Sequence, residues 1–379
     1  MGHVLVSPDK FKGSLSGREV AEHLAAGLRR ARPDIAVDLC PVADGGDGTL
    51  DAVLTAGFRR VPVVAEGPTG EPVQTAYAER DGTAVVEMAD VSGLNQLPGG
   101  KLAPLTASSY GTGQVIRAAL DAGCHTVVLG IGGSASTDGG AGMLQALGGR
   151  LLDAAGAELP RGGAALADLD RLDAAGLHPR LREAQIVVAS DVDNPLLGAR
   201  GAAAIYGPQK GAGPDDVRDL DAALARWAAV VVRDAGVAAD LPDRPGAGAA
   251  GGVGFATTAL LGATSRPGID LLLDLLGFSS RLAGARLVIT GEGSLDEQTL
   301  HGKAPAGVAV AARAAGVPVV AVAGRVALDR GDLTRAGILA AYALADLEPD
   351  PARSMAEAGA LLERVAGRLA ADWLTEESG

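Results

Sequence analysis

The residues best suited to chemistry stand in short glycine-rich loops that follow apolar runs. The loop richest in glycine, GIGGSASTDGGAGM at 130–143, holds six glycines together with Ser134, Ser136, Thr137 and Asp138. Glycine lets the backbone turn several N–H groups toward one anion, and the hydroxyls add further donors. The loop therefore predicts a phosphate-binding site, and an ordinary turn between a strand and a helix is the alternative.

Two earlier loops combine glycine with charge. The loop PDKFKGS places Lys10 and Lys12 just before a helix start, which suits a phosphate or carboxylate unless the loop is simply a basic surface. The loop ADGGDGT carries Asp44 and Asp47 among three glycines. Mg²⁺ takes one or two protein carboxylates with phosphate oxygens and water, but Asp and Gly are also common in turns and helix caps.

Three later loops add carboxylates and single lysines: SDVDNPLLG, YGPQKGAG and TGEGSLDEQTLHGKAP. The candidate residues in these loops are Asp191, Asn194, Lys210, Glu292, Asp296, Gln298, Thr299 and Lys303. Phosphoryl transfer needs such a set, because its catalysis rests on positioning and charge stabilisation, with a carboxylate to take the proton of the acceptor hydroxyl.

Other functions are disfavoured. A net charge of −13 and a pI near 4.9 argue against nucleic-acid binding, and no apolar run is long enough to span a bilayer. The two cysteines and five histidines show no metal-ligand spacing, and only His301 stands in a candidate loop. There is no Walker A sequence, and the one G-x-G-x-x-G, at 246–251, does not follow a predicted strand.

The dominant pattern is an apolar run, a polar loop and an Ala/Leu-rich helix, which indicates an α/β fold with a mainly parallel sheet. A helix is predicted over 17–31, because Ser16 and Glu19 form a capping-box pattern before an apolar stripe. Residues 61–93 alternate β-rich runs with turn signals, which predicts an antiparallel meander. The stretch RLLDAAGAELP at 150–160 predicts a hairpin.

The N- and C-terminal thirds of the chain share the same pattern of apolar run, polar loop and helix, and the middle third has a different pattern. We therefore expect a discontinuous α/β domain built from 1–62 and 285–379, with a mixed α/β domain inserted over 63–284. An active cleft is expected between these two domains.

Taken in order, the loops resemble the signatures of type-1 bacterial glycerate kinases almost from end to end. They stand here as SPDKFKGSLS, PVADGGDGT, SYGTG, GIGGSASTDGGAGMLQALG, DVDNPLLG, GAAAIYGPQKGA, GAGAAGGVGF and TGEGSLDEQTLHGKAP. The resemblance implies ATP-dependent, Mg²⁺-assisted phosphorylation of D-glycerate, typically at O2 to give 2-phosphoglycerate. It also implies a flavodoxin-like parallel-sheet domain made from both chain ends and an inserted, restriction-enzyme-like domain.

Four positions depart from the family pattern. The family has Ser in place of Lys10, Glu in place of Asp47, ATND in place of ASTD at 135–138, and Arg in place of Ser294. The last change removes a guanidinium that could hold a carboxylate or phosphate. We hypothesise that Lys10 supplies part of that charge.

The resemblance nominates residues for each role. Lys12 and Lys303 are the expected catalytic cations, and Asp191 or Asp296 is the expected general base. The residues expected to bind substrate or phosphate are Asp9, Lys10, Ser14, Gly132, Gly133, Ser134, Asp138, Asn194, Lys210, Glu292, Gln298 and Thr299. The expected metal ligands are Asp44 and Asp47, which could instead hold substrate hydroxyls.

The expected small molecules are glycerate, ATP and Mg²⁺, with no nucleic-acid or membrane partner. A homodimer is a candidate assembly for this protein, and the cytoplasm is its expected location. The first alternative is a kinase of the same family that gives 3-phosphoglycerate or takes a related small hydroxy acid. A nucleotide-dependent oxidoreductase and a non-catalytic sensor of small acids are the others.

Overall fold

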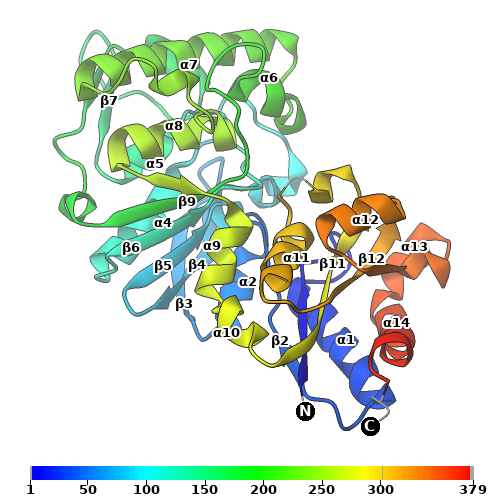
Figure 1. Cartoon of the computed structure of the whole chain (residues 1–379). Coiled ribbons are helices and arrows are strands. Elements are labelled where there is room, and N and C mark those ends of the chain that lie inside the picture. The colour runs from blue at the N-terminus through cyan, green and yellow to red at the C-terminus, as the bar shows by residue number, and fades with distance from the viewer. Residues whose placement is uncertain (1, 301, 376–379) are drawn as a thin grey trace. The chain divides into compact units, whose positions relative to one another are not determined.

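The computed structural model describes residues 2–300 and 302–375, so His301 lies outside the described residues (Figure 1). The chain divides into two compact units. The first contains Met1–Asp44, Asp51–Gly57 and Ile269–Gly379, and the second contains Gly45–Leu50 and Phe58–Gly268. Among the described helices, none combines the length and the apolar character needed to cross a membrane.

The first unit is built on a five-stranded sheet with the order β13-β12-β11-β1-β2, in which every neighbouring pair is parallel. Its strands are β1 (His3–Pro8), β2 (Val37–Leu39), β11 (Ala285–Leu295), β12 (Val319–Val326) and β13 (Ala340–Ala343). The predicted mainly parallel sheet is therefore confirmed. The two ends of the chain share this sheet, because β1 lies against β11 at its centre (Figure 1).

Helices cover both faces of the first sheet. The helices α1 (Gly17–Ala31) and α14 (Ala358–Trp373) bury their apolar sides on one face. The helices α9 (Gly268–Leu275), α10 (Phe278–Leu282) and α11 (Ala304–Ala314) contribute to the core on the other face. The remaining helices with residues in this unit are α2 (Thr49–Leu54), α12 (Arg330–Ala336) and α13 (Pro351–Ala356). Continuous Val/Ile/Leu runs suit strands that are buried on both faces.

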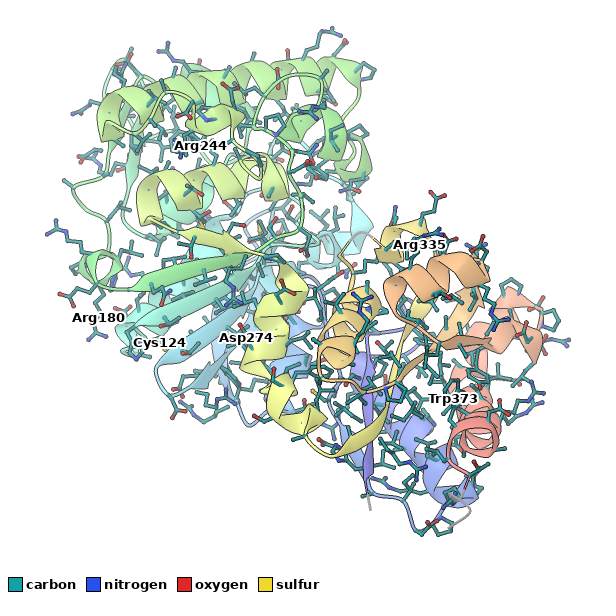
Figure 2. The ribbon with its side chains drawn as sticks, viewed as in Figure 1. Cys124, Arg180, Arg244, Asp274, Arg335 and Trp373 are labelled. Atoms are coloured by element: carbon teal, nitrogen blue, oxygen red, sulfur yellow. The ribbon has the colours of Figure 1, made fainter. Side chains whose placement is uncertain are left out.

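Two local features fix the ends of the first unit. The predicted capping box is confirmed, since Ser16 and Glu19 each accept a hydrogen bond from the other residue's backbone. At the other end, the Trp373 indole (labelled in Figure 2) donates to the Tyr342 hydroxyl at 2.9 Å, and Tyr342 donates to Asp372 at 2.8 Å. These bonds tie α14 to the edge strand β13.

The second unit is built on a six-stranded mixed sheet with the order β10-β9-β6-β5-β4-β3. Its strands are β3 (Arg59–Glu66), β4 (Pro72–Arg80), β5 (Thr83–Glu87), β6 (Thr126–Gly130), β9 (Gln185–Ala189) and β10 (Thr264–Arg266). The antiparallel pairs β3–β4 and β4–β5 confirm the predicted meander. The strands β5, β6, β9 and β10 are parallel, so their carboxyl ends lie at one edge.

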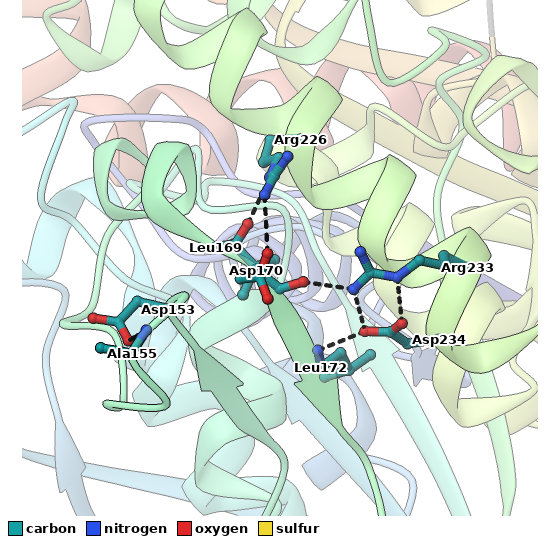
Figure 3. Close-up of polar contacts among 8 residues, drawn as sticks. All are labelled: Asp153, Ala155, Leu169, Asp170, Leu172, Arg226, Arg233 and Asp234. Atoms are coloured by element: carbon teal, nitrogen blue, oxygen red, sulfur yellow. Dashed lines mark hydrogen bonds and ion pairs between the residues drawn. The ribbon is translucent and has the colours of Figure 1, made fainter.

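The helices of the second unit pack around the sheet and a small hairpin-like pair. They are α3 (Ala89–Ser92), α4 (Tyr110–Asp121), α5 (Ala141–Ala146), α6 (Ala202–Tyr206), α7 (Pro214–Ala235) and α8 (Ala249–Leu261). Figure 3 shows Arg226 and Arg233 of α7 donating to the backbone carbonyls of Leu169 and Asp170, just before β8 (Arg171–Asp173). The long helix therefore holds this strand in place.

The hairpin predicted over 150–160 forms as a short antiparallel bridge between Leu152 and Glu158, with the Leu159 N–H donating to the Leu151 carbonyl at 2.8 Å. The longer pairing of β7 (Arg150–Leu152) is with β8. The turn does form, because the Asp153 carboxylate accepts the N–H groups of residues 155 and 157 at 2.8 and 2.9 Å. The stronger antiparallel partner comes from about 20 residues further along the chain, which the local pattern could not indicate.

The close packing of α1 on α14 gives a test of the first unit. A Cβ added at Gly27 would lie 2.4 Å from the backbone oxygen of Glu363, whereas a Cβ at Gly367 would meet nothing within 4 Å. We expect Gly27→Ala to lower the free energy of unfolding by about 1–3 kcal/mol through overpacking. Gly367→Ala, the control in the other helix, should raise it by about 0.5–1 kcal/mol. Urea unfolding measures both, and equal effects would contradict the backbone contact.

Candidate functional site

The centre of the first sheet brings two candidate loops together. β1 leads into α1 on one face, and β11 leads into α11 on the other, so the winding direction changes between these two neighbouring strands. Asp9 follows β1, and its backbone N–H donates to the carbonyl of Gly291 at 2.7 Å. Glu292 is the next residue of β11. In open parallel sheets, ligands bind beyond the carboxyl ends of the strands at such a point.

Asp9 is a buried carboxyl at this edge. Burial raises its pKa to about 7, with a smaller contribution from Asp44, although the nearby charge of Lys10 acts in the opposite direction. The Lys10 backbone N–H and ammonium both donate to Asp9 Oδ1, at 2.6 and 3.3 Å. The side chain of Lys10 is therefore engaged with Asp9.

The loop after β11 forms the best-defined charged cluster of the first unit. Thr299 donates its hydroxyl to Glu292 Oε1 at 2.5 Å. The Lys303 ammonium, at the N-cap of α11, lies 3.6 Å from Glu292 Oε2 and 3.8 Å from Asp296 Oδ1. Both distances exceed a hydrogen bond. Burial raises the pKa of Glu292, while Thr299 and Lys303 lower it.

The other candidate residues of the first unit differ in whether their side chains are free to bind a ligand or are bonded within the protein. Ser14 donates its hydroxyl to the backbone carbonyl of Met355 at 2.7 Å, so this group helps to hold the loop. Lys12 and Gln298 are exposed. The Gln298 backbone N–H donates to Asp296 Oδ1 at 3.0 Å, which fixes that carboxylate at the start of a 3₁₀ turn.

In the second unit, the glycine-rich loop after β6 packs directly on other protein segments. A Cβ added at Gly132 would lie 2.7 Å from the Cα of Gly46, and one at Gly139 would lie 2.5 Å from the Trp227 ring. A Cβ at Gly142 would lie 2.1 Å from the Ser108 hydroxyl. Internal packing therefore requires these glycines, and the phosphate site stays a prediction.

The G-x-G-x-x-G at 246–251 has a similar packing role. No strand precedes it directly; a 3₁₀ turn at Leu241–Asp243 does. A Cβ added at Gly251 would lie 2.2 Å from the backbone oxygen of Ser136, and the Gly139 N–H donates to the Gly251 carbonyl at 2.9 Å. Gly251 thus supports the loop after β6, whereas Gly248 packs on the segment after β9, with its added Cβ 2.2 Å from the Pro195 carbonyl oxygen.

Lys210, one of the residues expected to bind substrate or phosphate, lies inside the second unit. It is fully buried, and its ammonium donates to Ser134 Oγ at 2.9 Å and to the backbone carbonyl of Ser136. Burial lowers its pKa to about 7. The hydroxyls of Ser136 and Thr137 are also buried, and neither has a hydrogen-bond partner among the described residues. This part of the loop faces the protein interior.

Asp138 is likewise a buried anchor. Its Oδ2 accepts hydrogen bonds from the Ser109 backbone N–H and hydroxyl, both at 2.8 Å, and from the Gly142 N–H at 3.2 Å. Its Oδ1 accepts the Gly140 N–H at 3.2 Å. These bonds connect the start of α5 to the start of α4.

Asp191 and Asn194 lie in the loop after β9. Both oxygens of the exposed Asp191 carboxylate approach the Gly268 N–H, at 3.1 and 3.3 Å. Asn194 is engaged on both sides, because it accepts from the Tyr206 hydroxyl at 2.6 Å and donates to the Arg200 carbonyl at 2.9 Å.

Glu87, the last residue of β5, is not among the candidates predicted from the sequence. Its two carboxyl oxygens accept the backbone N–H groups of Gly48 and Leu50, at 3.0 and 2.8 Å, and so hold the loop that carries Asp47. Burial raises the pKa of Glu87 to about 8, and Asp90 contributes in the same direction. An acidic residue that ends an apolar strand was the available signal.

The metal candidates Asp44 and Asp47 belong to different units. Among the described residues, no three His, Cys, Asp or Glu side chains converge to hold a metal ion by themselves. Asp44 lies close enough to Asp9 and Glu292 to raise both of their pKa values.

Ser294 stands where the resemblance expects an arginine. Its hydroxyl is buried and has no hydrogen-bond partner among the described residues. In the parallel pairing of β11 with β12, its register partner is Arg325, which is exposed.

Comparison with known proteins gives one consistent result. The family model described as the glycerate kinase family matches residues 4–374. The chain is 44% identical over 371 residues to a glycerate kinase of Bacillus subtilis (strain 168), with 97% of each chain covered. It is 44% identical over 345 residues to a glycerate 2-kinase of Escherichia coli (strain K12), with 90% of each covered. The crystal structure of a protein assigned as glycerate kinase 2, from Salmonella typhimurium LT2, matches with a TM-score of 0.84 and 43% identity, covering 99% of this chain and 100% of that one.

The pKa of Glu87 predicts a pH-dependent stability. Between about pH 4.5 and 8 the folded state keeps a proton that the unfolded chain has lost, so this carboxyl makes the free energy of unfolding fall as the pH rises. Glu87→Gln cannot ionise. We therefore expect its stability relative to the wild type to improve across that window.

Chemical unfolding at several pH values measures this difference. Glu183→Gln, at an exposed position in the same unit, controls for the loss of a surface carboxylate. A Glu87→Gln difference that stays constant from about pH 4.5 to 8 would contradict the proton-retaining carboxyl.

Proposed function

Because this chain belongs to the glycerate kinase family, we propose that it phosphorylates D-glycerate at O2 and releases 2-phosphoglycerate. It is a kinase that uses ATP to phosphorylate glycerate. The proposal concerns the enantiomer, the hydroxyl and the residues that act. The single observation that carries these roles is the Lys303 ammonium, held between Glu292 and Asp296 at the carboxyl edge of the first sheet.

Lys303 is suited to stabilise charge during transfer. Its ammonium lies beyond hydrogen-bond distance from both carboxylates, so its N–H donors can turn toward an oxyanion without breaking a short bond. The two carboxylates hold the ammonium near this position. A fixed cation beside a transferring phosphoryl group is worth most in a site that excludes water.

The general base is proposed to be Asp296 or Asp191. Asp296 lies beside Lys303, and one of its oxygens accepts a single backbone N–H, which leaves acceptor capacity for a substrate hydroxyl. Asp191 is exposed at the carboxyl end of β9, where a hydroxyl could approach it. The carboxylate would accept the hydroxyl proton as the oxygen attacks the γ-phosphorus.

Mg²⁺ is proposed to accompany ATP, with Asp44 as its protein ligand in the first unit and Asp47 as a candidate in the second. The donors are carboxylate oxygens, the type that Mg²⁺ prefers, and phosphate oxygens and water would complete its octahedral shell. When bound, the ion neutralises phosphate charge. Burial raises the pKa of Asp9 and of Glu292, and the nearby carboxylate of Asp44 adds to both shifts, which fits a place for a cation.

The remaining proposals concern binding and architecture. Lys12, Ser14 and the loop at 132–140 are proposed to hold the glycerate carboxylate and the ATP phosphates. Renumbered within the first unit, the sheet order reads 2-1-3-4-5, which supports a flavodoxin-like domain. The domain limits (1–62 with 285–379, and 63–284), the restriction-enzyme-like inserted domain and the cleft stay predictions. So do the homodimer and the cytoplasmic location.

The assay that tests the function follows ADP release with Mg·ATP and either D- or L-glycerate, and NMR identifies the product. Turnover of D-glycerate to 2-phosphoglycerate is expected. Formation of 3-phosphoglycerate would instead support the alternative kinase, and no turnover with either enantiomer would overturn the proposal.

For Lys303, we expect Lys303→Ala to reduce kcat by about 10²–10³-fold, because a charge-stabilising group is lost from the transition state. The melting temperature should change little, since its ion pairs are long and partly exposed. Lys101→Ala, at an exposed lysine of the second unit, is the control and should leave kcat unchanged. If Lys303→Ala unfolds the protein, Lys303 is structural.

The two candidate bases can be separated by Asp191→Asn and Asp296→Asn. Asparagine keeps the shape of the side chain but cannot accept the hydroxyl proton. Only the base variant should abolish turnover at saturating substrates, while the other should alter KM more than kcat. Steady-state kinetics of both variants is the measurement, and equal, mild losses would show that neither is the base.

A further inference from the structure

We propose that Arg325, on β12, binds an oxyanion of one of the two substrates in the site of the first unit. The carboxylate of glycerate and the phosphates of ATP share this chemistry. The inference rests on the proposed function, which it deepens by adding a binding residue that lies outside every glycine-rich loop singled out in the sequence.

The register of the sheet places Arg325 at the charged edge. β11 and β12 are parallel, with Glu292 opposite Ala323 and Ser294 opposite Arg325. Residues two apart on a strand share a face, and so do register partners on neighbouring strands. The register therefore places Arg325 beside Ser294, two residues beyond the Glu292–Ala323 pair. Standard strand spacings put the Cα atoms of Glu292 and Arg325 about 8 Å apart.

The Lys303 cluster stands at the same carboxyl edge, because the Lys303 ammonium lies 3.6 Å from Glu292. Lys12 belongs to the loop that follows β1, and its backbone nitrogen lies 3.4 Å from the place of a Cβ on Gly293, which points away from the face of Glu292. Lys303 and Arg325 are therefore the cations that stand at the carboxyl ends of β11 and β12, and Lys12 lies in a loop beside β11.

The side chains next to Arg325 leave its guanidinium available. Arg325 is exposed and forms no ion pair with any residue that the structure describes. Its register partner Ser294 is small, and the serine hydroxyl is buried. Arg325 is therefore the only long side chain of the Ser294–Arg325 register pair, and its partner does not crowd the guanidinium.

The carboxylates at this edge create a need for positive charge, which Arg325 can supply. The carboxyls of Asp9, Asp44, Glu292 and Asp296 lie at this edge, and they would repel an anionic substrate. A guanidinium stays charged at every relevant pH, and its planar fork matches the two oxygens of a carboxylate or phosphate. Arg325 thus offsets the carboxylates with a donor geometry that neither lysine has.

The first test compares Arg325→Ala and Arg325→Lys with Arg368→Ala, which removes an exposed arginine from α14 on the opposite face of the sheet. Arg325→Ala should raise KM for one substrate by about 10–100-fold, because a charged hydrogen-bonding partner is lost. Arg325→Lys should recover only part of the loss, and Arg368→Ala should behave as the wild type. Circular dichroism checks that each variant folds.

The second test moves the guanidinium across the register pair. Arg325→Ser should raise KM, and the double variant Ser294→Arg with Arg325→Ser should restore most of the affinity, because the two positions are neighbours on adjacent strands. A merely structural arginine would not be replaced by one on another strand.

The outcomes separate this inference from the proposed function. A rise in KM for glycerate identifies the carboxylate as the ligand of Arg325, and a rise in KM for ATP identifies a phosphate. If the wild type turns over glycerate and Arg325→Ala leaves both KM values within about twofold, the inference is overturned while the function stands. If the wild type shows no turnover, the proposed function fails first, and unchanged affinities of folded Arg325→Ala for both ATP and glycerate in calorimetry then overturn the inference as well.

Discussion

The second unit depends on direct contact between its own backbone segments. The loop after β6 touches the segment at 45–46 on one side and the segment at 246–252 on the other, at distances that leave no room for a Cβ. Such contact brings peptide dipoles close together without intervening side chains, so the polar groups that become buried there need partners. Asp138 and Lys210 provide them, and they are buried because the loops close over them.

In the first unit, charge rather than backbone contact is the main constraint. Parallel strands deliver their carboxyl ends to one edge, and here that edge receives several acids. Burial keeps a proton on Asp9 up to about pH 7, so the edge carries less negative charge than its composition suggests. Burial raises the pKa of Glu292 as well. This matters for a kinase whose substrates are both anions, because every ionised carboxylate that faces them weakens binding unless a cation offsets it.

The sequence was sufficient to predict the helices and strands named here, but it did not predict which loop side chains point into the interior. The capping box at Ser16, the meander and the mainly parallel sheet follow from local patterns, and the structure confirms them. Lys210 and Asp138 were chosen as ligand-binding residues because their types suit phosphate sites, yet both are buried in the interior. Whether a loop residue points inward is decided by segments far away in the sequence, and glycine spacing alone cannot distinguish an anion-binding loop from a tightly packed one.

The same limit explains why a motif can mislead about charge. The signature around Ser294 suggests that a guanidinium has been lost, and the sequence analysis looked for its replacement in Lys10, whose ammonium is engaged with Asp9. In a parallel sheet, however, the nearest neighbour of a residue is its register partner, which here lies 31 positions later at Arg325. Positions that are distant in sequence can therefore supply the same group to the same face, so the charge of a site has to be counted across the sheet rather than along one motif.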